Sequence, residues 1–171
     1  TIAESPDGKL LIGSELGLAV FDSETLIFHL FSHKPGDPSS LPSSFVNDIV
    51  VDHGYVWLGM REGFLRLTWP EREPRLFVPD PENPASTANN SIRTMAVDHQ
   101  GNLWGGSDNG LYRMDLQTGA IRTYRHDPAD PNNLTWHIFV DQRGWVWTGS
   151  DGGGINLYDE NRDSFRRLRA S

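Results

Sequence analysis

The chain has 171 residues, no cysteine and a formal net charge of -8 at pH 7. The missing cysteines exclude a disulfide scaffold and a cysteine-ligated zinc site, and the acidic balance argues against nucleic acid as a partner. No apolar run approaches the roughly 18 residues of a membrane span and no signal-peptide pattern opens the chain, so we expect one soluble domain, or part of one, without membrane contact from this segment.

One pattern recurs four times along the chain. It consists of a turn ending in glycine, an apolar pair, a second glycine and an alternating apolar segment that closes on Asp or Thr, and it is clearest in DHQGNLWGGSDNGLYRMD (98–115). The other copies are SPDGKLLIGSELGLAVFD (5–22), DHGYVWLGMREGFLRLT (52–68) and DQRGWVWTGSDGGGINLYD (141–159). The second glycines of the four copies lie 46, 47 and 43 residues apart, at Gly13, Gly59, Gly106 and Gly149. Such a period is typical of a repeat architecture.

Within each repeat the apolar period is two residues, which predicts short antiparallel strands separated by tight turns. In chain order we expect one four-stranded blade in each of 1–44, 45–90, 91–135 and 136–171, the first strand of the first blade being cut short. Four-stranded repeats of roughly 40 to 50 residues are typical of β-propellers, whereas immunoglobulin-like domains need about seven strands and roughly 100 residues each. The predicted fold is therefore all-β, a β-propeller domain of about four blades.

The residues that recur in every repeat are interpreted as scaffold. Every blade needs the same turns and the same packed aromatic side chain, whereas a phosphate-binding loop needs a Gly-Lys-Ser/Thr ending and a following helix, and neither is present. We expect positive φ at Gly101 and Gly110, and capping of turn amides by Asp98 and Asp115. The predicted structural anchors are Trp57, Trp104, Trp147, Gly59, Gly106, Gly149, Asp98 and Asp141.

No metal or other cofactor is expected. No two histidines and an acid stand at the spacing of a local metal site, although a metal bound by separate blades stays open. Nucleophile elbows of the G-x-S-x-G type are absent as well, so the sequence does not predict an enzyme.

The motif D-x-x-G-x-L-W-x-G-S/T-x-x-G-L-x-R/N-x-D, followed by H-D-P-x-D-P-x-x-L, resembles the two-component regulator propeller repeat. It matches best in 98–115 with its continuation YRHDPADPNNL (124–134), and nearly as well in 141–159. Three departures occur: Leu11 replaces the tryptophan, the turn at 52–54 is short, and Thr68 replaces the Asp that leads the later turn.

The resemblance implies a sensor domain of a bacterial receptor, on the periplasmic side of the inner membrane. In such proteins a histidine kinase or a diguanylate cyclase follows, and in the best-known members the ligand is a carbohydrate. About seven blades are implied, so this chain is expected to be an arc of a larger propeller. The apolar end faces of the blades built on Leu11 and Trp147 would then be covered by the remaining blades of the parent protein or by self-association.

Ligand binding in a propeller is expected where the repeats differ. The candidate residues lie at the starts of the innermost strands: Asn47, Asp48, Arg93, Thr94, Trp136 and His137. An exposed Trp136 would stack on a sugar while its polar neighbours bind hydroxyls; alternatively, Trp136 only packs between blades. Two other functions stay open. One is a lyase resembling the streptogramin-opening enzymes, with a catalytic histidine and bound magnesium, and the other is a protein-interaction module.

The connector before the last repeat is short. Leu134 to Asp141 spans 7 positions, whereas Thr87 to Asp98 spans 11. This difference indicates either a trimmed connector or residues absent between 131 and 137.

Overall fold

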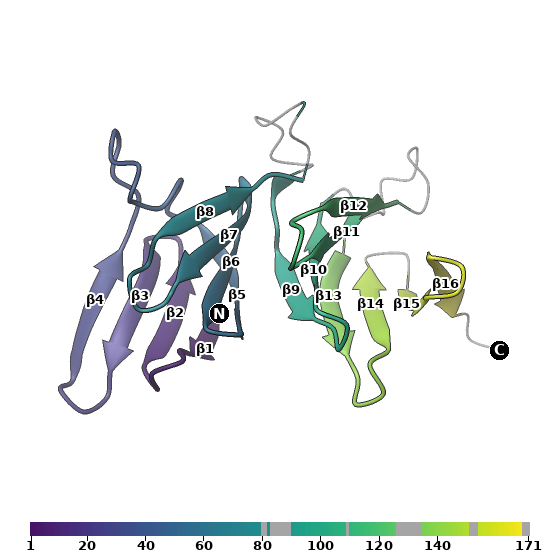
Figure 1. The fold of residues 1–171 in the computed structure, drawn as a ribbon, viewed down its shortest axis with the longest axis horizontal. Coiled ribbons are helices and arrows are strands. Elements are labelled where there is room, and N and C mark those ends of the chain that lie inside the picture. Colours follow the sequence, from purple (N-terminus) through teal and green to yellow (C-terminus); the bar gives the residue numbers. More distant parts are fainter. Residues whose placement is uncertain (80–81, 83–89, 109, 126–134, 151–153, 169–171) are drawn as a thin grey trace. The chain divides into compact units, whose positions relative to one another are not determined.

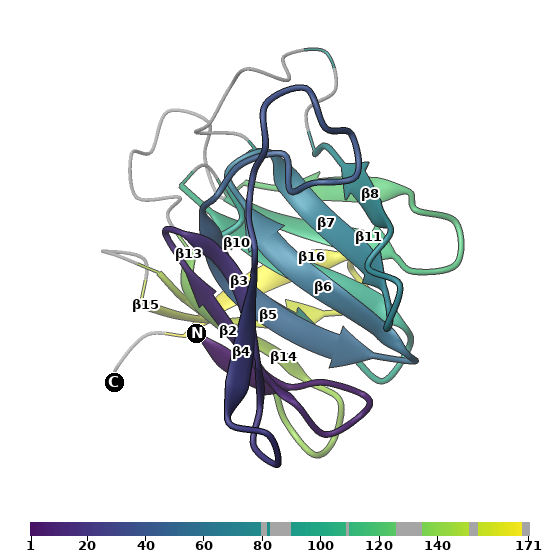
Figure 2. The same cartoon turned by 90° about the vertical axis from the view of Figure 1, so that its left-hand side faces the viewer.

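The computed structural model describes residues 1–79, 82, 90–108, 110–125, 135–150 and 154–168. These residues contain sixteen β-strands in four sheets, and each sheet holds four consecutive strands that pair antiparallel in chain order (Figures 1 and 2). The predicted all-β class and the four-stranded blades are confirmed. The short connector at 131–134 lies outside the described residues.

We number the sheets as blades 1 to 4. Blade 1 comprises β1 (Ile2–Glu4), β2 (Leu10–Ser14), β3 (Gly17–Asp22) and β4 (Ile27–Phe31). Blade 2 comprises β5 (Val46–Asp52), β6 (Tyr55–Met60), β7 (Gly63–Thr68) and β8 (Pro74–Phe77). Blade 3 comprises β9 (Thr94–Val97), β10 (Asn102–Ser107), β11 (Gly110–Asp115) and β12 (Ile121–Tyr124). Blade 4 comprises β13 (Thr135–Val140), β14 (Val146–Ser150), β15 (Gly154–Asp159) and β16 (Ser164–Leu168).

The chain divides into two compact units, Thr1–Ile92 with blades 1 and 2 and Arg93–Ser171 with blades 3 and 4. In unit 1 strand β5 packs on β1 and β2, and in unit 2 strand β13 packs on β9 and β10. The innermost strand of the second blade thus lies against the two inner strands of the first. The buried core of unit 1 includes Leu11, Leu18, Val20, Val46, Ile49, Leu58 and Leu65, and that of unit 2 includes Trp104, Leu111, Ile138 and Val146.

The second glycine of each repeat stands where a following strand or segment comes close. Distances from an added Cβ to an atom of the covering residue are 2.7 Å for Gly13 and Val46, 3.0 Å for Gly59 and Ile92, and 2.8 Å for Gly106 and Thr135. A side chain at these positions would collide with the next inner strand or the segment leading into it. The glycines therefore provide room for close packing between blades.

Blade 4 differs at this position. An added Cβ at Gly149 would meet no atom of the described residues within 4 Å, and its cross-strand partner Ile155 is 57% exposed. The equivalent partners in blades 1 to 3, Leu18, Phe64 and Leu111, are at most 4% exposed. Within unit 2, blade 4 therefore carries an open apolar face.

Candidate functional site

Asp98 organises the turn between β9 and β10. Its Oδ1 accepts hydrogen bonds from the backbone amides of Gln100 and Asn102, both at 2.9 Å, and its Oδ2 accepts one from Nε1 of Trp104 at 2.7 Å. Trp104 is fully buried, and Gly101 has the expected positive φ of 80°. The predicted capping is confirmed, and both carboxylate oxygens serve the turn and the packed indole.

The predicted features of the later turn in blade 3 are also present. Gly110 has φ 127°, and Oδ1 of Asp115 accepts the amides of Gln117 at 2.9 Å and Thr118 at 2.8 Å. These hydrogen bonds to the charged form lower the pKa of Asp115. Asp98 and Asp115, the acids at the two ends of the repeat at 98–115, therefore both stabilise turns.

In blade 4, Asp141 repeats the arrangement of Asp98. Its Oδ1 accepts the amides of Arg143 and Trp145 at 2.9 Å, and its Oδ2 accepts Nε1 of Trp147 at 3.0 Å. Burial of the carboxyl acts to raise the pKa of Asp141, but the hydrogen bonds from Trp147 and the two amides outweigh it and lower the pKa. Asp141 therefore remains a carboxylate that holds the turn.

Blades 1 and 2 depart from this arrangement in a correlated way. In blade 2 the short turn directs Asp52 toward His53, whose Nδ1 lies 2.7 Å from Oδ2, and the buried Nε1 of Trp57 has no hydrogen-bond partner among the described residues. In blade 1, Leu11 replaces the tryptophan, and Ser5 takes the place of the aspartate and accepts the amide of Lys9 at 2.9 Å. Because blade 1 has no indole nitrogen at the position of Leu11, the single hydroxyl of Ser5 is enough to accept the turn amide.

The six candidate ligand residues occupy equivalent places in blades 2, 3 and 4. The strand register shifts between Val46 and Asp48 and between Thr135 and His137, so Asn47 and Trp136 are β-bulges. Arg93 stands at the same place in blade 3, directly before β9, and its backbone amide donates to the carbonyl of Gly106 at 2.8 Å. Bulges re-aim a side chain and occur often beside binding sites.

Asn47, Asp48 and Thr94 contact neighbouring strands or segments within their own unit. Nδ2 of Asn47 donates to the carbonyl oxygen of Ile92 at 2.9 Å, and Oδ1 of Asp48 accepts Oγ1 of Thr1 at 3.0 Å. Thr94 is buried, with its methyl group 2.8 Å from the Cβ position of Gly106. These contacts give Asn47, Asp48 and Thr94 a structural part in joining strands.

The other candidates belong to unit 2. Arg93 is 44% exposed and forms a bidentate ion pair with Asp108, with Nη2 2.7 Å from Oδ2. His137 is exposed, and the side chain of Trp136 lies outside the described part of the chain. Ligand binding by the six residues stays a prediction.

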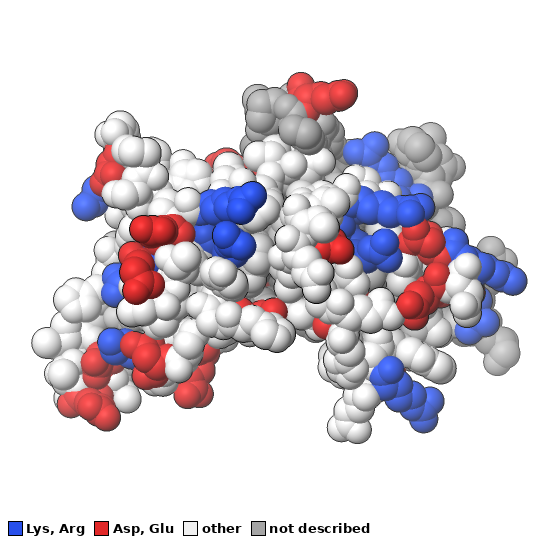
Figure 3. Space-filling model, in the orientation of Figure 1, with Lys and Arg blue, Asp and Glu red and all other residues white. Residues whose placement is uncertain are grey.

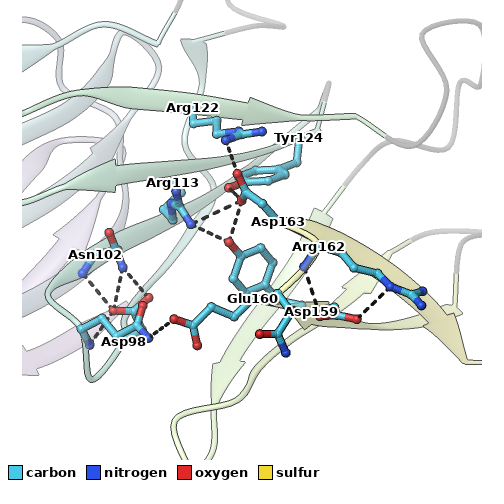
Figure 4. A network of polar contacts seen from close by, with 12 residues as sticks. Asp98, Asn102, Arg113, Arg122, Tyr124, Asp159, Glu160, Arg162 and Asp163 are labelled. Atoms are coloured by element: carbon cyan, nitrogen blue, oxygen red, sulfur yellow. Dashed lines mark hydrogen bonds and ion pairs between the residues drawn. The ribbon is translucent and has the colours of Figure 1, made fainter.

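A polar network between blades 3 and 4 was not predicted from the sequence (Figure 4). Asp163, in the turn between β15 and β16, accepts hydrogen bonds from the hydroxyls of Tyr124 and Tyr158, the latter at 2.6 Å. Its carboxylate also pairs with Arg113, at 3.4 Å from Nη1, and with Arg122. Asp163 of blade 4 is thus bound by four donors, and three of them, Tyr124, Arg113 and Arg122, belong to blade 3.

The network favours the charged form of Asp163 and the neutral form of Tyr124. Hydrogen bonds from Tyr124 and Tyr158, together with the two arginines, lower the pKa of Asp163. Burial, reinforced by the hydrogen bond to Asp163, raises the pKa of Tyr124. The rings of Trp104, Tyr124, Tyr158 and Phe165 pack beside one another, with centroids 4.8 to 5.9 Å apart. The hydrogen bonds and ion pairs of Asp163 and the packing of these four rings both join blade 3 to blade 4.

One sequence signal could have pointed to Asp163. The fifth residue of this turn has positive φ in all four blades, with φ 58° at Leu26, 62° at Arg72, 76° at Gly119 and 48° at Asp163. Glycine fits that conformation best, and aspartate tolerates it. Only blade 4 has an acid at this position, and that difference between the repeats is the signal for a specific contact.

Two hollows occur in the described residues. One of about 450 Å³ in unit 1 is formed by the connector at 33–42 and the outer strands of blade 2. Another of about 350 Å³ in unit 2 lies among the turns at 98–101 and 159–163 and the start of β14. On the face drawn in Figure 3, acidic and basic side chains are interspersed, without a broad basic surface among the described residues.

The described ranges contain no group of three or more His, Asp or Glu side chains that could hold a metal ion. Within the same ranges, no helix has the length and apolar character needed to cross a membrane.

Comparisons with known proteins place the chain among propellers. Residues 86–109 match the family model described as "Two component regulator propeller". No curated protein matches the chain. The extracellular domain of the hybrid two component system BT3049 from B. thetaiotaomicron is similar with a TM-score of 0.79 and 22% identity, over 98% of this chain and 24% of that one.

Two further solved structures illustrate the range of relatives. The extracellular domain of the hybrid two component system BT4673 from B. thetaiotaomicron is 25% identical, with a TM-score of 0.72 over 91% of this chain and 20% of that one. An ancestral GH74 enzyme is 12% identical, with a TM-score of 0.73 over 99% of this chain and 24% of its own, and this likeness concerns the fold alone. The chain spans about a quarter or less of each of these structures.

Proposed function

This chain carries the repeat of the two-component regulator propeller family, and on that premise we propose that it is a ligand-sensing part of a signal-transduction receptor, exposed outside the cytoplasm, whose ligand is a carbohydrate. The observation that carries the proposal is the 25% identity over 91% of this chain to the extracellular domain of BT4673. A propeller scaffold is suited to such a role because its repeated sheets hold variable turns and strand starts in fixed positions.

The hydrogen bonding of the described acidic residues supports binding rather than catalysis. Both acids of the most conspicuous motif, Asp98 and Asp115, are occupied in capping turns. The network around Asp163 lowers the pKa of this carboxyl below its ordinary value, whereas a general acid or base needs a pKa near the working pH. We therefore propose a binding module without catalytic activity.

A screen of soluble oligosaccharides against the 171-residue chain tests this function. Thermal unfolding is followed by tryptophan fluorescence with each glycan, with and without magnesium. Saturable stabilisation by one class of glycan is expected, because a ligand that binds only the folded state raises the melting temperature. Turnover of a lactone that requires magnesium would favour a lyase instead, and the lack of any glycan effect would overturn the carbohydrate proposal.

A further inference from the structure

We propose that the hollow in unit 2 built on Trp145 is a binding site for an uncharged, polyhydroxylated ligand. The inference rests on the proposed function and deepens it, since it names a site that none of the six candidate residues includes. The hollow measures about 350 Å³, within the usual range of roughly 300 to 1,000 Å³ for small-molecule sites.

Trp145 stands at a position where the scaffold does not require tryptophan. The residue that precedes the apolar pair is Lys9 in blade 1, Tyr55 in blade 2 and Asn102 in blade 3. In blade 3 Nδ2 of Asn102 binds the turn carboxylate at 2.9 Å, so a small polar side chain satisfies the fold there. Blade 2 also has an aromatic residue here, Tyr55, whose ring centroid lies 4.5 Å from the guanidinium carbon of Arg66, so what distinguishes Trp145 is that it lines the hollow.

The exposure of Trp145 makes its ring available to a ligand. Its side chain lines the hollow and is 46% exposed, while its ring centroid lies 6.1 Å from that of Trp147 and 5.5 Å from the guanidinium carbon of Arg143. These neighbours restrict the ring. An exposed, restrained indole loses little entropy on binding and offers an apolar surface on which the C–H face of a sugar can stack.

Polar side chains surround this aromatic surface. Gln100 from blade 3 and Glu160, Asn161 and Arg166 from blade 4 line the hollow. Nε2 of Gln100 donates to Oε1 of Glu160 at 2.7 Å, so the rim is already joined across the two blades before a ligand arrives. Carboxylates accept hydrogen bonds from hydroxyls, and amides and guanidinium groups donate hydrogen bonds to them. Because a hydroxyl both donates and accepts, the side chains around the hollow match a polyhydroxylated ligand.

The charges around the hollow give an anionic ligand no net attraction. Three acids, Asp98, Asp159 and Glu160, line it with Arg166, while Arg143 lies beside the Trp145 ring and Arg162 pairs with Asp159. Among the described residues the acids and bases therefore balance, and a uronate or a sulfated sugar would bring its charge beside carboxylates without a surplus of basic groups to hold it. A neutral oligosaccharide needs no such surplus.

The test uses the 171-residue chain and matched panels of neutral and uronic-acid oligosaccharides, with binding followed by tryptophan fluorescence and calorimetry. W145N carries the side chain that blade 3 has at this position, and W145A and E160Q provide independent variants. R93A probes the candidate set at the strand starts. Circular dichroism and melting curves verify that each variant is folded.

We expect a neutral oligosaccharide to bind, W145N and W145A to weaken it at least about tenfold, and R93A to change it less than about threefold. Binding that survives both Trp145 variants would overturn this site while leaving the proposed function standing. If only the uronic-acid oligosaccharides bind, the proposal that the ligand is uncharged is wrong. If neither panel binds, the proposed function fails and this inference fails with it.

Discussion

The methyl carbon Cγ2 of Thr135 lies 2.8 Å from the point that a Cβ on Gly106 would occupy. Blade 4 thus begins by filling a space that blade 3 leaves empty. Gly106→Ala should therefore lower the free energy of unfolding by about 1 to 3 kcal/mol, because β13 or β10 must shift.

Gly149→Ala is the matched control, since at the same position in blade 4 no atom of the described part of the chain lies within 4 Å of the added Cβ. Its effect should stay within about 0.5 kcal/mol. Urea unfolding followed by tryptophan fluorescence measures both variants. Equal losses for the two glycines would contradict the proposed role of the close approach.

The indole hydrogen bond provides a second comparison, between Trp104 and Trp57. Both side chains are buried, but Nε1 of Trp104 donates to Asp98, whereas Nε1 of Trp57 has no partner in the described part of the chain. Trp104→Phe should therefore cost about 1 to 2 kcal/mol more than Trp57→Phe.

A double-mutant cycle isolates that hydrogen bond from the aromatic contacts of Trp104. In an Asp98→Asn background, Trp104→Phe should cost less than in the wild type, because the charged acceptor is already gone. Additive losses in the two backgrounds would show that the indole nitrogen contributes nothing through Asp98.

The third prediction concerns pH and Asp163. The pKa of this carboxyl is lower in the folded protein than its ordinary value of 3.8, so the unfolded chain takes up the proton first as the pH falls. The stabilisation is fully present above pH 3.8 and disappears as the pH falls through the lowered folded value.

Asp163→Asn is the appropriate variant, because asparagine tolerates the positive φ at this position. It should lower the free energy of unfolding by about 1 kcal/mol near neutral pH, and the difference from the wild type should shrink as the carboxyl protonates. Urea unfolding at a series of pH values tests this. A difference that stays constant into the acid range would argue that the charge of Asp163 is unimportant.

The fourth prediction concerns the open face around Ile155. An isoleucine that is 57% exposed at a position buried in the other blades favours association with another apolar face. Analytical ultracentrifugation of the 171-residue chain should show a mass that increases with concentration, and Ile155→Lys should reduce the effect.

Leu16→Lys serves as the control for that experiment. Leu16 is 70% exposed in the turn between β2 and β3, and the substitution adds the same charge away from the open face. If both lysine variants reduce association equally, net charge and not the blade 4 face is responsible. A monomer at all concentrations would refute the expectation.

Local sequence patterns predicted the strands and the turn chemistry, because both depend on residues within one repeat. Alternating apolar residues defined the sheets, and aspartates such as Asp98 marked the capped turns. Contacts between repeats could not be read in this way. The link from Asp163 to Arg113 joins residues 50 positions apart, and a single repeat contains only one of them.

The candidate site illustrates the same limit. Repeat comparison identified Asn47 and Arg93 as variable positions, but it could not reveal that each already binds a carbonyl or an acid nearby. The position of Trp145 is equally variable, but a tryptophan two residues before the repeated one resembles the scaffold when only the sequence is compared. Only its exposure and its polar surroundings separate it from Trp147.

The glycine positions also bear on how such a chain can change in evolution. Three different β-branched residues, Val46, Ile92 and Thr135, lie over the glycines of the preceding blades. Within each unit, the first blade thus meets the second through a glycine and a β-branched residue, Gly13 with Val46 and Gly106 with Thr135. Because valine and threonine both fit over the glycine, a junction of this kind does not depend on one particular partner, and a repeat could be duplicated or lost while each turn diverges on its own.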